Sequence, residues 1–140
     1  MSGLGECQLK HIKKYEPILD LFADGGNNFK SMRDYNIQVI ATAEYNANND
    51  IELILFDKAL QKYENHTLFI EWPIYNDDLP SLALLLYTGK IFLYFGSLRD
   101  GSNLKSEFFD ILDKHWNIIH KELVSKNLNK DIYFIIYERK

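Results

Sequence analysis

The stretch Leu82–Gly96, LALLLYTGKIFLYFG, decides the fold that the sequence predicts. It holds two apolar runs, 82–87 and 91–96, on either side of the tripeptide TGK at 88–90, which is typical of a tight turn. Almost every position of both runs is apolar, and this pattern indicates strands that are covered on both faces. We therefore predict a hairpin whose two strands lie at the centre of a sheet.

Other segments also have the composition of strands. Residues 37–45 alternate apolar and polar side chains, as a half-buried strand does, and residues 131–138 are apolar on both sides. The turn-forming sequence NANND follows the first of these segments, so we predict a second hairpin over residues 37–57. A helix over residues 50–64 is the competing interpretation. Residues 67–72 are predicted as a further strand.

Two segments have the periodicity of amphipathic helices. One covers residues 6–22, although Pro17 would remove one backbone hydrogen bond there, and the other covers residues 103–126. The sequence thus predicts an α+β fold with a single domain over residues 1–140. A mostly antiparallel sheet of about six strands would carry an N-terminal helix and a long C-terminal helix packed on it.

Composition restricts the class of protein. The chain has 140 residues, of which 46% are hydrophobic, so it can bury a core of its own. It contains neither an apolar run long enough to cross a membrane nor a cationic start followed by an apolar stretch. Its single cysteine, Cys7, cannot form a disulfide framework. We expect a cytoplasmic protein, and the abundance of Asn, Lys and Ile suggests a bacterial or phage source.

The net charge of −4 is unevenly distributed along the chain. Residues 36–80 carry two lysines against eight acidic residues, which gives this third a net charge of −6. A concentrated negative surface attracts basic partners and repels nucleic-acid phosphates and anionic lipids. We therefore expect a basic protein partner, and no direct binding to nucleic acid or to membranes.

In its general profile, this small and acidic chain without a catalytic motif resembles the immunity proteins that protect bacteria from cognate toxins. The resemblance implies a non-catalytic inhibitor of a basic toxin such as a nuclease, whose acids take the place of phosphates beside an aromatic anchor. The residues expected to contact the partner are Glu52, Asp57, Glu71, Tyr75, Asp77 and Asp78. A phage inhibitor of a host defence complex is an alternative that predicts the same acidic surface.

A different class of function is a small enzyme or ligand-binding domain with a pocket between the sheet and the C-terminal helix. On a helical wheel of residues 103–126, His115 and Glu122 fall in the apolar sector and would line such a pocket. A core histidine with a backbone partner is the competing interpretation. The sequence shows no zinc spacing, P-loop or dinucleotide fingerprint, and we read its Gly25-Gly26 stretch as a loop. No metal or cofactor is predicted.

Overall fold

The computed structural model describes residues 3–23, 27–45, 50–71, 78–98, 106–126 and 131–140. Its strands are β1 (Ile18–Leu21), β2 (Val39–Ala43), β3 (Ile51–Leu53), β4 (Thr67–Glu71), β5 (Ile91–Gly96), β6 (Trp116–Lys126) and β7 (Asp131–Arg139). Its helices are α1 (Glu6–Lys13), α2 (Asn27–Asp34), α3 (Phe56–Lys62), α4 (Leu79–Leu86) and α5 (Ser106–His115).

The described strands form one mixed sheet in the order β3-β2-β1-β4-β5-β7-β6. All neighbours from β3 to β5 are parallel. β7 is antiparallel to both β5 and β6. The predicted α+β fold with a mostly antiparallel sheet is therefore wrong, and the molecule has an α/β architecture in which helices connect parallel strands.

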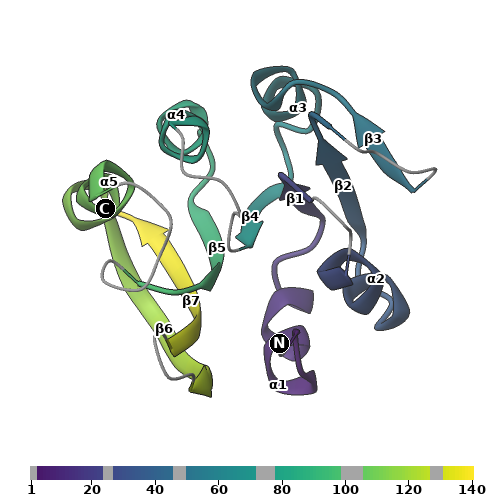
Figure 1. Cartoon of the computed structure of the whole chain (residues 1–140), viewed down its shortest axis with the longest axis horizontal. Coiled ribbons are helices and arrows are strands. Elements are labelled where there is room, and N and C mark those ends of the chain that lie inside the picture. Colours follow the sequence, from purple (N-terminus) through teal and green to yellow (C-terminus); the bar gives the residue numbers. More distant parts are fainter. Residues whose placement is uncertain (1–2, 24–26, 46–49, 72–77, 99–105, 127–130) are drawn as a thin grey trace.

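Helices cover both faces of the sheet (Figure 1). Helices α3, α4 and α5 lie on one face, where Ala59, Leu84 and Phe108 pack in the same core cluster. Helices α1 and α2 lie on the other, where Ile12 and Met32 join a second cluster. Strands β4 and β5 are buried between these layers, which explains why their sequences are apolar at nearly every position.

The predicted central hairpin is only half right. Residues 91–96 form the central strand β5, but the apolar run before TGK is helix α4, with Pro80 in its first turn. Ala83 and Leu84 are buried, whereas the leucines on the opposite side of the helix are exposed. A helix that is apolar all round has no period to distinguish it from a buried strand, and this caused the error.

The predicted long C-terminal helix is also wrong. The helix α5 ends at His115, and the chain continues directly as the 11-residue edge strand β6. The pairing of β6 with β7 shifts register between Ile118 and His120, so Ile119 is an extra residue in the strand. This bulge places two apolar residues in succession, and that spacing resembles a helical stripe.

Two further predictions need correction. The proposed helix over residues 6–22 is the helix α1 followed by β1, and the proposed hairpin over 37–57 is the parallel pair β2 and β3 followed by α3. By contrast, the strands predicted over 67–72 and 131–138 are confirmed as β4 and β7 within the described residues. No helix in the described ranges combines the length and the apolar character needed to cross a membrane.

Candidate functional site

The order of the parallel strands defines a switch point between β1 and β4. From β1 the chain proceeds outward to β2 and β3, and it then crosses to β4 and β5 on the other side of β1. In open α/β sheets, ligands bind outside the carboxyl ends of the strands at the point where the direction of winding changes. A ligand site is thus expected at the carboxyl ends of β1 and β4, at the centre of the sheet in Figure 1.

Asp20 lies in β1 close to this point. It is 0% exposed, and within the described ranges neither of its carboxylate oxygens has a hydrogen-bond partner. Burial, and secondarily the charge of Glu71, raises the pKa of the Asp20 carboxyl well above its ordinary value. A buried polar group without a partner is rare in folded proteins and calls for an explanation.

Glu71, the last residue of β4, shares a face of the sheet with Asp20. In the register of the two strands Asp20 pairs with Phe69, two residues before Glu71, so alternation directs both carboxylates toward α1 and α2. Asn28, which is buried in the first turn of α2, donates a 2.7 Å hydrogen bond from Nδ2 to Glu71 Oε2. Its Oδ1 accepts a 3.3 Å bond from the backbone N–H of Leu4.

Other polar groups lie at the carboxyl ends of further strands of the sheet. Ser97, which directly follows β5, and Thr42, near the end of β2, have buried hydroxyl oxygens without hydrogen-bond partners in the described part of the chain. Tyr94 donates its hydroxyl proton to the backbone carbonyl of Ser97 over 2.6 Å. The carboxyl ends of several neighbouring strands thus carry polar atoms that the described residues leave without partners.

The turn after β1 has an unusual conformation. Phe22 adopts φ of 61°, in the left-handed region that L residues rarely occupy, and its ring packs 6.1 Å from that of Phe56 on the α3 face. The backbone N–H of Phe56 donates a 2.8 Å hydrogen bond to Glu44 Oε2, immediately after β2. In dinucleotide-binding folds, an acid about 20 residues beyond the glycine-rich turn contacts ribose hydroxyls.

The six residues predicted as partner contacts are dispersed in the structure. Glu52 lies on β3, where it accepts hydrogen bonds from Lys62 Nζ and from the hydroxyl of Tyr63. Asp57 is in α3 and Asp78 directly precedes α4, whereas Glu71 belongs to the switch point. Tyr75 and Asp77 lie outside the described residues.

The predicted pair of His115 and Glu122 does not form. His115 is exposed at the end of α5, whereas Glu122 lies in β6 and accepts a 3.0 Å hydrogen bond from Gln8 of α1. A strand followed by a helix does not preserve the helical spacing on which that pairing depended. Among the described residues, no group of three or more His, Cys, Asp or Glu could hold a metal ion.

Sequence reasoning missed Asp20 and Asn28, although a signal for both exists. Asp20 is a lone charge inside the apolar run ILDLF, and Gly25 and Gly26 follow it before Asn28. A strand, a glycine pair and then a helix is the order in which nucleotide-binding folds build their first turn. Reading residues 6–22 as one helix concealed that order.

Comparisons with known proteins agree with this topology. No protein-family model matches the sequence, and no curated protein matches it. Several solved structures are similar in fold, and three of them illustrate the likeness. An uncharacterized protein from Listeria monocytogenes serotype 4b has a TM-score of 0.61 at 13% identity, over 98% of this chain and 68% of that chain.

The other two structures are described as methyltransferases. The B. subtilis M1A22 tRNA methyltransferase TrmK has a TM-score of 0.59 at 11% identity, over 98% of this chain and 67% of that one. A putative tRNA (m1A22) methyltransferase from Streptococcus pneumoniae, in complex with S-adenosyl-L-methionine, has a TM-score of 0.58 at 11% identity, over 97% and 73%. At these identities the likeness shows the fold alone.

A methyltransferase-like α/β fold contradicts the interpretation of the chain as an immunity-type toxin inhibitor. The expectation of a non-catalytic protein is corrected with it, since the neighbours with described functions are enzymes. The error arose because acidic charge and the absence of a local motif carry no information about a site that several strand ends assemble.

Proposed function

We propose that this chain binds S-adenosylmethionine at the switch point between β1 and β4 and catalyses methyl transfer. The observation that carries the proposal is the carboxylate of Asp20, which is fully buried and lacks a hydrogen-bond partner among the described residues. The similar fold of a methyltransferase in complex with S-adenosyl-L-methionine supports the choice of ligand.

The chemistry of the site fits such a ligand. Two acids, Asp20 and Glu71, share one face of the sheet, and each raises the cost of ionising the other unless a cation binds between or beside them. S-adenosylmethionine is such a cation, and it supplies a methyl group activated by its positively charged sulfur. Asp20 and Glu71 would hold its charged part, with Asn28 fixing the carboxylate of Glu71.

The opposite side of the strand ends suits the nucleoside part. Glu44 stands after β2, and its Oε2 accepts a hydrogen bond from the Phe56 N–H. Phe22, which occupies the turn where glycine is common, belongs to the core cluster of the α3 face, whereas the two acids face α1 and α2. Its ring therefore lies on the opposite face of the sheet from the two carboxylates.

The proposal does not extend to the tRNA substrate of the neighbours. Residues 36–80, which include the ends of β2 and β4, carry a net charge of −6 and repel nucleic-acid phosphates. We propose instead an uncharged or cationic acceptor, in keeping with the basic partner that the charge distribution predicts. We also propose a cytoplasmic location, which the single, exposed Cys7 supports because a secreted chain of this size commonly has disulfides.

The first prediction concerns ligand affinity. Titration calorimetry with S-adenosylmethionine should give a saturable isotherm for the wild-type chain, and Asp20→Asn should weaken binding by roughly 10- to 100-fold. That factor is the loss of one hydrogen bond to a charged group, about 1.5–3 kcal/mol.

The matched control is Asp34→Asn, which removes an exposed carboxylate at the end of α2 and should leave the affinity unchanged. S-adenosylhomocysteine, which lacks the sulfonium charge, should bind the wild type and Asp20→Asn with more similar affinities. The proposal fails if the wild type does not bind the donor, or if Asp20→Asn binds it as tightly as the wild type does.

A further inference from the structure

Helix α1 packs on the sheet through its apolar face. Leu9 and Ile12 are buried in one cluster with Phe69, Phe95 and Phe134 of the sheet. In the registers of β4, β5, β7 and β6, Glu71 pairs with Phe95, Phe95 with Phe134, and Phe134 with Glu122. The helix therefore covers a row of paired strand residues in which Phe95 and Phe134 lie between Glu71 and Glu122.

Polar contacts hold the start of α1 at both of these ends. The Gly5 N–H donates a 2.6 Å hydrogen bond to Gln8 Oε1, and Gln8 Nε2 donates a 3.0 Å bond to Glu122 Oε1. On the other side, the Leu4 N–H donates to Asn28, which in turn donates to Glu71. The position of α1 is thus coupled directly to a carboxylate of the candidate site.

A pair of histidines lies between α1 and β6. The rings of His11 and His120 are 4.1 Å apart between centroids, and each is 6.3 Å from the ring of Phe134 in β7. His120 Nε2 is buried without a hydrogen bond among the described residues, and it faces Glu122 Oε2 at 3.6 Å. Lys14, which follows α1, also contributes a positive charge near His11.

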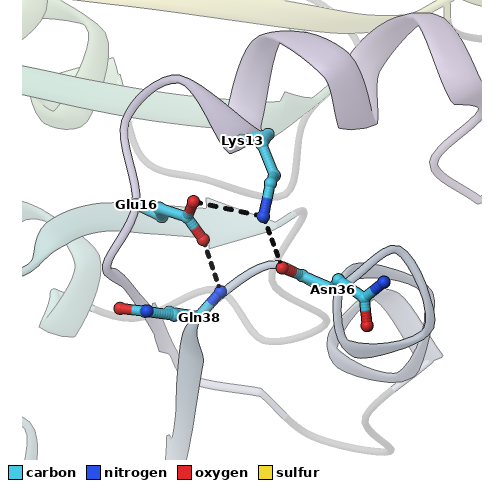
Figure 2. A network of polar contacts seen from close by, with 4 residues as sticks. All are labelled: Lys13, Glu16, Asn36 and Gln38. Atoms are coloured by element: carbon cyan, nitrogen blue, oxygen red, sulfur yellow. Dashed lines mark hydrogen bonds and ion pairs between the residues drawn. The ribbon is translucent and has the colours of Figure 1, made fainter.

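The other end of α1 is anchored independently (Figure 2). Lys13 Nζ donates a 2.6 Å hydrogen bond to the carbonyl of Asn36 and lies 3.2 Å from Glu16 Oε2. Glu16 Oε1 accepts a 2.8 Å bond from the N–H of Gln38, which is the first cause of the lowered pKa of Glu16. This anchor keeps its charges in mild acid, because the carboxylate stays ionised there.

Protonation in mild acid weakens the contacts at the start of α1 but not the anchor at its end. A proton on His11 would place a positive charge against the ring of His120, 4.1 Å away between centroids. Burial, the charge of His120 and that of Lys14 lower the pKa of His11, and Glu122 only partly offsets them. The released helix consequently binds a proton more readily than the docked one. Docking is complete above the ordinary histidine pKa of about 6.5 and weakens as the pH falls below it.

We propose that α1 is a pH-sensitive latch over the carboxyl edge of the sheet. At neutral pH the contact between the two histidine rings and the hydrogen bond of Gln8 hold it closed, with Asn28 bonded to Glu71. In mild acid the N-terminal end of α1 separates from β6 and from Asn28, and the helix pivots about its anchored end at Lys13.

Hydrogen exchange measured by mass spectrometry at pH 7.5 and pH 5.5 tests this latch. After correction for the intrinsic pH dependence of exchange, the amides of α1 should lose protection severalfold at the lower pH, while those of β4 and β5 keep theirs. His11→Phe keeps a ring against His120 but cannot be protonated, so its α1 should stay protected at both pH values. A dye on Cys7, the single cysteine and an exposed residue of α1, should report the same release as a fall in anisotropy.

His66→Gln is the control, since burial also lowers the pKa of His66 but this residue precedes β4, outside α1 and β6. It should respond to pH as the wild type does. Equal protection of wild-type α1 at both pH values overturns the latch, as does a full acid response in His11→Phe, or in His11→Gln if the first variant does not fold. No ligand enters the experiment, so its failure is separate from a failure of the proposed methyl-donor site.

Discussion

Phe22 combines two opposing contributions to stability at a single residue. Its backbone, at φ of 61°, costs about 1–2 kcal/mol relative to a right-handed conformation. Its ring, which is 5% exposed and packs against Phe56, offsets that cost, because truncating a buried phenylalanine loses about 3–5 kcal/mol. The turn after β1 is therefore maintained by core packing on the α3 face and not by the local preference of the chain.

This balance predicts that Phe22→Gly is more stable than Phe22→Ala, although alanine is normally the more stabilising of the two residues. Phe22→Ala loses the ring and keeps the strained backbone, whereas Phe22→Gly loses the ring and relieves the strain. Both should destabilise the protein, but the glycine variant by roughly 0.5–1 kcal/mol less, in urea denaturation at constant m-value. An alanine variant as stable as the glycine variant would show that the turn is unstrained.

At the scale of elements, the connection from α4 to β5 is held by the end of β7. Arg139 donates from Nη2 to the carbonyl of Tyr87 over 2.6 Å and from Nε to that of Gly89 over 3.0 Å. Its guanidinium lies 4.4 Å from the ring centroid of Trp116, and that ring stacks on Tyr87. A Cβ atom on Gly89 would clash with the ring of Tyr87, so the glycine of TGK serves a close approach and not a hairpin turn.

Arg139→Lys should therefore be destabilising although the charge is kept. A lysine cannot donate to both carbonyls and stack on Trp116 at once, and we expect a loss of about 1–3 kcal/mol in the free energy of unfolding. Arg33→Lys is the comparison, because Arg33 forms a half-exposed ion pair with Asp50, and such pairs contribute about 0–1 kcal/mol. Similar losses in both variants, measured by urea denaturation, would contradict the role given to Arg139.

At the scale of the whole molecule, the ionisation of Asp20 is linked to global unfolding. β1 lies inside the sheet with β2 and β4 on either side, and the Asp20 side chain is fully buried in the folded protein. The raised pKa means that the folded protein binds this proton more tightly than the unfolded chain does. The resulting stabilisation is complete below the unfolded pKa of 3.8 and is lost as the pH rises through the folded value.

Asp20→Asn should accordingly stabilise the ligand-free protein at neutral pH and flatten this part of its pH dependence. The free energy of unfolding, measured in urea from pH 4 to pH 8, provides the check, and Asp34→Asn should reproduce the wild-type curve. In the ligand-free state Asp20→Asn thus acts in the opposite direction to its effect on donor binding. A variant that is less stable than the wild type at neutral pH would show that the carboxylate has a structural partner.

The sequence predicted best where one local pattern corresponds to one structure. Strand β2 was predicted from its alternation, and β4 and β7 were predicted from short apolar segments between turn signals. The run at 82–87 failed because apolar residues all round fit a buried strand or a buried helix equally well. Glu71 was singled out for its charge, but its neighbour in space, Asp20, is 51 positions earlier in the chain.

By itself, the sequence determined which segments are buried, where four of the strands lie and how the charge is distributed, because these properties depend on local composition and period. Only the tertiary structure decided that the sheet is largely parallel, that α4 is a helix and that Asp20 meets Glu71 at a switch point. The physical reason is that strand order and the juxtaposition of strand ends depend on packing between distant segments. No local period records that packing.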